Sequence, residues 1–519
     1  MRSWIWALLL GVSCQRVIPA EPVPPGPAPE ALVFPEGFLW GTAIAGFQVD
    51  AGCPTLPAAQ CQDPNSDWFQ WATDPELIND PGNFLSGEPL QGAPGHFELF
   101  AEDSRISRDI LGANSLRTSI EWSRIFPNEP IGANTVDALE AFANPEAVAH
   151  YHQVFQSIKQ NGLTPLVTLN HYSIPLWLHD GKECNQNPDT CTKRGWMDRA
   201  RMVKEIALYS GFCAREFGAE IDLWATLNEP FAIILAGYLQ PSETRTNPPG
   251  IVAPARAVEV AFAMIEAHVK MYDAVHAEDL VDADGNGQAA EVGLVHNLVA
   301  SQPADPDNEF DVLGAQHLDY LLNRVFLNGT ILGDLDADLD GVTEVTGDPN
   351  FIGRMDYLGI NYYTRAIAAG TGVPVLPEIP VFDFFPTIPF DNFPQGLYEV
   401  AMIGAEYNVP IMITENGVTD PNGDDTTANF LVPHLEELHR AIQDGADVRG
   451  YFYWSLIDNY EWNHGMNAFK FGLFAIDPLD PLKSRVPKES VGVFRQIATQ
   501  NTISSSLRQR FGLANLLAQ

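Results

Sequence analysis

Eight short apolar runs recur along this chain, and longer segments with helical periodicity separate them. The apolar residues within a run are mostly consecutive rather than alternating, and Val, Ile, Leu, Trp and Tyr dominate. Strands of this kind are buried on both faces, as in a parallel sheet covered by helices. Eight strand–helix units favour a closed (β/α)8 TIM barrel, an α/β fold of one domain with long loop insertions, over a doubly wound sheet. The runs span residues 38–48, 115–122, 164–171, 222–229, 291–297, 357–363, 410–416 and 448–456.

Polar residues able to do chemistry stand at the end of nearly every run. In a barrel the carboxyl ends of the strands meet at one face, where the active site lies. Strand ends are often polar without any function, but that does not account for a carboxylate, an amide or an imidazole at nearly all eight. We therefore expect one pocket to gather Gln48, Glu121, His171, Asn228, Glu229, Asn297, Asn361, Tyr363, Glu415 and, just past the eighth run, Glu461.

The charge of the chain excludes whole classes of partner. Its 519 residues include 29 Lys and Arg against 67 Asp and Glu, which gives a net charge of −38. Binding a polyanion needs clustered basic residues that release counterions, so we expect no nucleic acid partner and no attraction to anionic lipid. The 11 Trp, 29 Phe and 14 Tyr also supply more apolar surface than a disordered chain carries.

The N-terminal segment is typical of an exported protein. About ten apolar residues follow Arg2, too few to span a bilayer, so residues 1–13 are predicted to be a signal peptide. The run ends Leu-Gly-Val-Ser-Cys14, which resembles a bacterial lipoprotein cleavage site with a lipid on Cys14, and plain secretion is the alternative. A proline-rich tether (14–33), the folded domain (34–505) and a C-terminal tail (506–519) follow. We expect a lipoprotein of the cell envelope or a secreted or periplasmic protein, with membrane contact only through Cys14.

Five cysteines lie beyond this segment, and their spacing predicts two disulfides. Cys53 and Cys61 are eight positions apart, Cys184 and Cys191 seven, and each pair lies in a polar loop. The alternative of zinc would require CxxC spacing or interleaved His, and neither is present. Cys213 lies in an apolar helical stretch and is expected to be a buried small hydrophobe.

Two glutamates stand in apolar strand ends, where a carboxylate is costly unless it is paired or used. Glu229 ends the run Trp-Ala-Thr-Leu-Asn-Glu, and Glu415 follows Ile-Met-Ile-Thr. Two carboxylates that face each other across a sugar are what glycoside hydrolysis needs, because one protonates the leaving oxygen and the other attacks the anomeric carbon or activates water. Aspartic-protease chemistry also uses a carboxylate pair, but its residues are aspartates in different settings.

The segments TLNEP (226–230) and ITENG (413–417) resemble the signatures of family 1 glycoside hydrolases, and the resemblance extends from about Phe34 to about Ser504. Segments around Cys61 and Gly445 are most similar to the branch that contains the archaeal β-glycosidases, which take glucosides and galactosides. Further segments match in order: FLWGTAIAGFQ (38–48), SIEWSRIFP (119–127), LNHYSIPLWL (169–178), LGINYYTR (358–365) and YWSLIDNYEW (453–462).

The resemblance assigns roles to individual residues. It implies that Glu415 is the nucleophile and Glu229 the acid/base of a double displacement with retained configuration. Arg117 and Tyr363 match the positions that hydrogen-bond the nucleophile, which would keep Glu415 ionised, and Asn228 matches the residue that holds the sugar 2-hydroxyl. No cofactor is implied. The remaining sugar-hydroxyl and stacking positions are matched by Gln48, His171, Trp454 and Glu461, with Trp462 beside them.

Three residues qualify the resemblance. Glu121 precedes a segment whose role in the family is structural, and Arg124 is its expected partner, so we leave Glu121 out of the catalytic set. Asp50 stands where the family usually has Glu, so a carboxylate is kept with a shorter reach. Tyr172 stands where many members carry Trp.

Two acidic loops fit the first half of a D-x-[DN]-x-[DN]-G calcium loop, but position twelve is Gly293 in one and Gly347 in the other instead of a bidentate Glu. Acidic turns rich in Asp and Gly are also simply turns. Structural calcium is thus one possible cofactor. Its candidate ligands are Asp282, Asp284 and Asn286 in the first loop and Asp336, Asp338 and Asp340 in the second.

The leading interpretation is a retaining exo-β-glycosidase that acts on a small β-glycoside or oligosaccharide, with terminal glucosyl and possible galactosyl or fucosyl residues. The alternatives are a catalytically inactive carbohydrate-binding member at the cell surface and a calcium-stiffened adhesin. Both glutamates are present, whereas inactive members typically lose one. Glu461 also argues against phospho-glycosidases, which put Ser at that position.

A segment rich in proline and phenylalanine follows the sixth run, between residues 366 and 396. It is too proline-broken for a helix and too apolar for an ordinary surface loop. One hypothesis is an apolar platform for the aglycone, and the other is that the phenylalanines pack against the barrel's own helices. The phenylalanines are Phe382, Phe384, Phe385, Phe390 and Phe393.

Overall fold

The computed structural model of this chain describes residues 29–370 and 390–516. The predicted signal peptide, Cys14 and the tether as far as residue 28 lie outside these ranges. Within them, no helix is both long and apolar enough to cross a bilayer.

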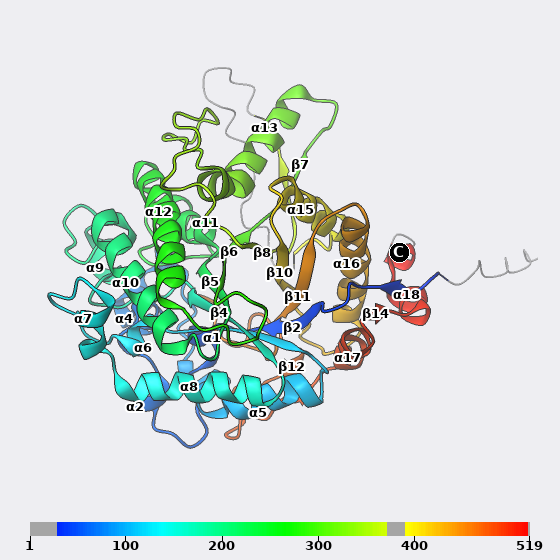
Figure 1. The fold of residues 1–519 in the computed structure, drawn as a ribbon, viewed down its shortest axis with the longest axis horizontal. Coiled ribbons are helices and arrows are strands. Elements are labelled where there is room, and N and C mark those ends of the chain that lie inside the picture. Colours follow the sequence, from blue (N-terminus) through cyan, green and yellow to red (C-terminus); the bar gives the residue numbers. More distant parts are fainter. Residues whose placement is uncertain (1–28, 371–389, 517–519) are drawn as a thin grey trace, which may run out of the picture.

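Eight parallel strands close into a barrel at the centre of the molecule, with helices around it (Figure 1), and the predicted (β/α)8 fold is confirmed. Each strand falls within one of the eight apolar runs. The ring closes where β10 pairs with both β8 and β11, and β11 pairs with β2. The strands are β2 (Leu39–Ala43), β3 (Ser115–Ser119), β4 (Thr164–Asn170), β5 (Leu223–Asn228), β6 (Glu291–Asn297), β8 (Tyr357–Asn361), β10 (Ile411–Asn416) and β11 (Val448–Trp454).

The helices that follow the strands begin at sequence signals that stabilise a first turn. Asn144 caps α8 by accepting a hydrogen bond from the Glu146 amide at 3.1 Å, and a proline occupies the first position of α8, α12 and α15. The longer helices are α5 (His96–Asp109), α8 (Pro145–Gln160), α10 (Arg199–Phe217), α12 (Pro254–Glu278), α13 (Glu309–Asp319), α15 (Pro394–Glu406), α16 (Thr426–Gln443) and α17 (Ser490–Gln500).

Shorter elements fill the connections. A two-stranded parallel sheet of β7 (Ala300–Pro303) and β9 (Arg365–Ala368) lies beside α13, and β12 (Phe474–Ala475) pairs with β13 (Val486–Pro487). Three π-helical turns occur at η5 (Leu235–Leu239), η6 (Tyr320–Arg324) and η7 (Asn328–Leu332). The short α-helices are α1 (Gly46–Val49), α2 (Ala58–Cys61), α3 (Asp67–Thr73), α4 (Pro75–Asn79), α6 (Trp122–Ile125), α7 (Val136–Leu139), α9 (Gly181–Gln186), α11 (Pro230–Ile234), α14 (Val325–Leu327), α18 (Ser505–Phe511) and α19 (Leu513–Leu516), and the 3-10 turns are η1 (Pro81–Asn83), η2 (Leu90–Gly92), η3 (Glu140–Phe142) and η4 (Gly195–Met197).

Large aromatic residues fit into the barrel interior because the neighbouring strand carries glycine beside them. A Cβ on Gly41 would lie 2.5 Å from the ring of Phe452, and a Cβ on Gly293 would lie 2.5 Å from the ring of Tyr357. Both aromatic side chains are fully buried. The barrel is therefore a packed core, and its functional surface lies at the strand ends.

The two ends of the described chain meet at the amino ends of the strands. Strand β1 (Leu32–Val33) pairs antiparallel with β14 (Thr502–Ile503), and the indole of Trp40 in β2 donates to Asn501 at 2.8 Å. Helix α18 follows and binds α16 through an ion pair of 2.6 Å between Arg508 and Glu436. Figure 1 shows these segments side by side. Parts of the expected tether and tail thus contact the barrel.

The structure contains both disulfides that the spacing predicts. The Cα atoms are 5.9 Å apart in Cys53–Cys61 and 5.0 Å apart in Cys184–Cys191. Cys213 is buried in α10, and burial raises the pKa of its thiol. It behaves as a small core residue, as expected.

Candidate active site

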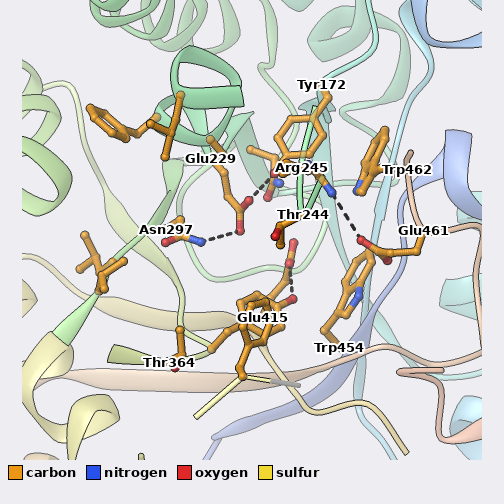
Figure 2. A pocket seen from close by; sticks show the side chains of 18 of the residues that line it. Tyr172, Glu229, Thr244, Arg245, Asn297, Thr364, Glu415, Trp454, Glu461 and Trp462 are labelled. Carbon is orange, nitrogen blue, oxygen red and sulfur yellow. Dashed lines mark hydrogen bonds and ion pairs between the residues drawn. The ribbon is translucent and has the colours of Figure 1, made fainter. Parts of the chain in front are cut away.

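A single cavity at the carboxyl ends of the strands gathers nearly all the residues that the sequence singled out (Figure 2). Residues from the ends of β4, β5, β6, β8, β10 and β11 line it. Arg117, in the middle of β3, lies buried beneath them. Of the sequence-predicted site residues, the cavity is lined by Gln48, His171, Asn228, Glu229, Asn297, Tyr363, Glu415, Trp454, Glu461 and Trp462.

Glu415 is the next-to-last residue of strand β10 and accepts hydrogen bonds from two side chains. Arg117 Nη1 donates to Oε1 at 2.6 Å, and the Tyr363 hydroxyl donates to Oε2 at 2.7 Å. Burial raises the pKa of Glu415 to about 7, and Arg117 opposes this rise while the charge of Glu229 adds to it. The two expected contacts are therefore present, but they offset only part of the cost of burying the carboxylate.

Glu229 follows strand β5 in the left-handed backbone region, with φ at +46°. Its Oε1 accepts from the amides of Asn361 at 2.8 Å and Asn297 at 3.4 Å. Its Oε2 accepts from the hydroxyl of Tyr172. All three partners are neutral, in contrast to the guanidinium on Glu415, so the two carboxylates occupy electrostatically different settings.

A chain of hydrogen bonds joins the two glutamates. Arg117 donates to Glu415 through Nη1 and to the side-chain oxygen Oδ1 of Asn228 through Nη2, the latter at 2.6 Å. Asn361 donates at 3.2 Å to the same oxygen and also to Glu229. Figure 2 shows both carboxylates directed into the one cavity. Their relative position is thus fixed by buried groups, as a two-carboxylate reaction requires.

The opposite side of the cavity carries polar atoms without a protein partner. Arg117 fixes the orientation of the Asn228 amide, whose nitrogen then donates to His171 Nε2 at 3.2 Å, so the imidazole proton is assigned to Nδ1. Among the residues described, neither His171 Nδ1 nor Gln48 Oε1 has a hydrogen-bond partner, and both are buried. Buried polar atoms are nearly always satisfied, so these point to a hydroxyl-bearing ligand.

Glu461, Trp454 and Trp462 complete this side. Gln48 and Asn459 each donate to Glu461 at 3.1 Å, and Arg245 contacts it at 3.4 Å. The rings of Trp454 and Trp462 lie nearly parallel to His171 at 6.1 and 5.9 Å. Carboxylate and amide oxygens beside an aromatic face match the hydroxyls and the C–H surface of a sugar.

Residues 31–503 match the family model described as Glycosyl hydrolase family 1, which covers most of the chain. The chain belongs to this family. A β-galactosidase of Pyrococcus woesei is 32% identical over 521 residues, with 92% of this chain and 99% of that protein covered. A bifunctional β-D-glucosidase/β-D-fucosidase of Bifidobacterium breve is 28% identical, with 91% and 99% covered. The crystal structure of the β-glycosidase from Thermosphaera aggregans aligns with a TM-score of 0.80 at 28% identity, with 92% and 99% covered.

This family 1 hydrolase also uses pocket residues that the strand-end pattern missed. Arg245 comes from an irregular loop between η5 and α12, where no strand ends, and its guanidinium lies 5.1 Å from the ring centre of Tyr172 and 5.0 Å from that of Trp462. Tyr172 was visible only as a departure from the family pattern. The lining of the cavity also includes the apolar residues Phe231, Leu235, Leu298, Val299 and Leu322.

The expected partnership of Glu121 with Arg124 is wrong. Arg124 forms its ion pair with Asp50 at 3.2 Å, while Glu121 accepts hydrogen bonds from the hydroxyls of Ser119 and Ser173. Burial raises the pKa of Glu121 to about 8, and the glutamate does not line the pocket. Asp50 thus retains a supporting contact, although it replaces the Glu usual in the family.

The segment after the sixth strand is described only in part. Phe390 lines the pocket with its ring centre 5.6 Å from that of Tyr363, whereas Phe393 packs partly buried against the core, beneath Arg365. Phe382, Phe384 and Phe385 lie outside the described residues. Phe390 therefore fits the hypothesis of a platform for the aglycone. Phe393 fits the hypothesis of packing against the barrel itself.

Both acidic loops bring carboxylates together in the family 1 hydrolase. Carboxylate oxygens of Asp336, Asp338, Asp340 and Glu344 lie within 4.8 Å of one another. In the other loop, Asp282 and Asp284 cluster with Asp222, and the side-chain nitrogen of Asn286 donates to Asp284 at 3.3 Å and to Glu291 at 3.1 Å. Glu344, at position nine of the second loop, was not expected from the pattern. Calcium at either loop stays a prediction.

Proposed function

We propose that this family 1 hydrolase is a retaining β-glycosidase that removes terminal non-reducing β-D-glucosyl residues, and also galactosyl or fucosyl residues. The observation that carries this proposal is the pair of glutamates at the ends of β5 and β10, which line one cavity and are joined by a fixed hydrogen-bond chain. Nothing in the described site favours the alternative of an inactive carbohydrate-binding protein.

In the proposed mechanism Glu415 attacks the anomeric carbon while Glu229 gives a proton to the glycosidic oxygen. The bond between that oxygen and the anomeric carbon breaks, and a covalent glycosyl–Glu415 intermediate forms. Water then attacks the same carbon, Glu229 takes a proton from it, and Glu415 leaves as a carboxylate. Arg117 and Tyr363 support this role of Glu415 because they donate to its charged form.

Recognition of the sugar falls to the polar side of the cavity. We assign the 2-hydroxyl to Asn228, the other hydroxyls to Gln48, His171 and Glu461, and the stacking face to Trp454 with Trp462 beside it. The buried Gln48 Oε1 and His171 Nδ1 support this assignment, because an uncharged polyol would satisfy them. No cofactor takes part in these steps.

Replacement of the two glutamates tests the proposed roles. Glu415→Ala should abolish turnover, and added azide or formate should restore a product of inverted configuration, because the small anion occupies the space the nucleophile left. Glu229→Ala should slow substrates with poor leaving groups by on the order of 10² to 10⁴-fold and good ones far less, since only poor ones need the proton. Product configuration by NMR and initial rates provide the measurements.

Glu259→Ala is a matched control, because this glutamate is exposed on α12, and it should keep full activity. Rescue with retained configuration would contradict the nucleophile assignment. Equal losses on good and poor leaving groups would remove Glu229 from the acid role.

We further propose that the protein is exported and anchored by a lipid on Cys14, with plain secretion as the alternative. The sequence around Cys14 motivates this, and the two disulfides support it because such bonds persist in oxidising compartments. Cys14→Ser should move the protein from the membrane to the soluble fraction without loss of activity. Unchanged fractionation on immunoblots would exclude lipid at Cys14 as the anchor.

A further inference from the structure

The three partners of Glu229 differ in what they can do when the carboxyl gains a proton. The Asn361 amide is fixed, because its oxygen accepts from Thr414 at 2.8 Å and its nitrogen donates to Asn228 as well as to Glu229. It can therefore only donate to Oε1. The Asn297 nitrogen donates to the same oxygen. A proton on Oε1 would meet amide hydrogens, so the acid proton belongs on Oε2.

The hydroxyl of Tyr172 is the one partner of Oε2 among the described residues, and a hydroxyl can both donate and accept. Burial, together with the charge of Glu229, raises the pKa of Tyr172 well above its usual value, so the hydroxyl keeps its own proton throughout. By turning about its C–O bond it can accept from a protonated Glu229 and donate to an ionised one. Neither amide has this property.

The backbone around this contact is strained in a way that fits a functional pair. Tyr172 has a φ of +71° and Glu229 a φ of +46°, in the left-handed region that residues other than glycine rarely adopt. Such conformations persist where the surrounding structure enforces them, and they cluster at active sites. Tyr172 is also buried, with its ring 4.7 Å from that of Trp462. Its hydroxyl is thus held in place by packing on the ring.

We propose that Tyr172 is the positioning residue of the acid/base. Its hydroxyl binds Oε2 of Glu229 in both protonation states of this carboxyl group. It thereby keeps the acid proton on Oε2, the oxygen that faces Tyr172. This rests on the proposed role of Glu229. In the acid form of the enzyme, Glu229 donates to the Tyr172 oxygen. When the proton passes from Oε2 to the glycosidic oxygen, the electron pair of the breaking bond stays on that oxygen. The Tyr172 hydrogen then turns to the new carboxylate, and Tyr172 gains and loses no proton.

Several charged groups face Tyr172 and Glu229, and they contribute to the pH dependence of the reaction. Arg245 lies over the Tyr172 ring and pairs with Glu461, and Glu415 carries charge across the cavity. Arg117 reaches Asn228 beside them. Burial lowers the pKa of His171 well below its usual value, so the neighbouring imidazole is neutral. None of these groups changes when only the Tyr172 hydroxyl is removed.

Tyr172→Phe tests the proposal, because it keeps the ring and removes the hydroxyl. A phenol donates more strongly to a carboxylate than a neutral acid donates to a phenol, so the variant loses stabilisation of the carboxylate that forms when Glu229 gives up its proton. We expect the basic limb of the kcat/KM profile to move up by about one pH unit, and kcat/KM for alkyl or phenyl β-glucosides to fall about 10-fold. For dinitrophenyl glucosides, which need no proton, the loss should stay within about 2-fold.

Three further experiments separate positioning from damage to the fold. Tyr209→Phe removes another buried tyrosine hydroxyl, bonded to the Leu169 carbonyl at 3.0 Å and outside the pocket, and should leave both the limb and the ratio of substrates unchanged. Trapping of the glycosyl intermediate with a fluoroglycoside counts competent sites in each variant. In a Glu229→Ala background, Tyr172→Phe should have no further effect on poor leaving groups.

Equal losses on both substrate classes, an unmoved basic limb, or a further loss in the Glu229→Ala background would each overturn the proposal. If the wild-type protein hydrolyses no β-glycoside, the proposed function itself fails. If it does, and Glu229→Ala shows the leaving-group dependence while Tyr172→Phe does not, only the inference about Tyr172 fails.

Discussion

Burial raises the pKa of Glu415, whereas the hydrogen bonds that support its carboxylate lower this pKa. Attack on the anomeric carbon needs the ionised carboxylate, and the pKa of this group in the free pocket is about 7. We therefore expect kcat/KM to fall as pH drops through about 7, and not only near the usual glutamate range. The limb belongs to a coupled pair, because the charge of Glu229 contributes to it.

Tyr363→Phe should move this acidic limb further up. The Tyr363 hydroxyl donates to the ionised form of Glu415, so its removal raises the pKa of that carboxyl, by about one pH unit. The variant should lose about 5-fold more kcat/KM at pH 6 than at pH 8, measured on an aryl glucoside with a good leaving group. An acidic limb that stays near pH 4.5 in both proteins would contradict the expectation.

The residues that the sequence revealed are those fixed by strand ends. Glu229, Asn297 and Glu415 follow from the position of a strand, because a barrel brings its carboxyl ends together. Arg245 could not be found in this way, since it reaches the pocket from an irregular loop whose path depends on packing. The partner of Arg124 was also misjudged, because proximity in sequence favoured Glu121 while the fold presents Asp50.

At the scale of elements, the apolar runs located all eight strands but not where each one stops. The apolar pattern predicts one unit over 38–48, whereas β2 ends at Ala43 and Gln48 lies on α1, two residues further on. The Gly46 amide donates to Ser119 at 2.8 Å, which draws this turn toward the end of β3. Such a tertiary contact leaves no period in the sequence, so hydrophobic periodicity could not reveal it.

The acidic loop at Asp336 offers a further prediction. Asp336 is buried, whereas Asp338, Asp340 and Glu344 are exposed. Partial desolvation and then repulsion from the neighbouring carboxylates raise the pKa of Asp338. A bound cation would remove this repulsion. With a dissociation constant of about 1 mM, 10 mM calcium would stabilise the protein by about 1.4 kcal/mol. Thermal melting with calcium, with magnesium and with chelator measures this.

Asp338→Asn with Asp340→Asn should remove the response to calcium, while Asp282→Asn in the other loop serves as the matched control. If melting is unchanged up to 10 mM calcium, the loop is only a turn. A response that survives the double substitution but not Asp282→Asn would move the site to the first loop.

For the whole molecule, closure of the barrel explains why the fold was predictable. Eight similar units must all be present for the ring to close, so the number of apolar runs predicts the barrel architecture. The small sheets β1–β14 and β7–β9 could not be predicted from the number of apolar runs. Their strands have two to four residues, too short for any periodic signal, and long-range pairing alone defines them.

The pairing of β1 with β14 has a consequence for how an anchored molecule would be oriented. Phe38 and Asn114, at the amino ends of β2 and β3, are joined by a hydrogen bond of 3.0 Å, and β1 enters the fold at this end. The cavity opens at the other ends of the strands. A protein held by its N-terminus would thus turn its closed base toward the cell surface and its mouth toward the medium. Freely diffusing glycosides would then reach the mouth of the cavity directly. Chains attached to the same cell surface would have to bend around the barrel to reach the cavity.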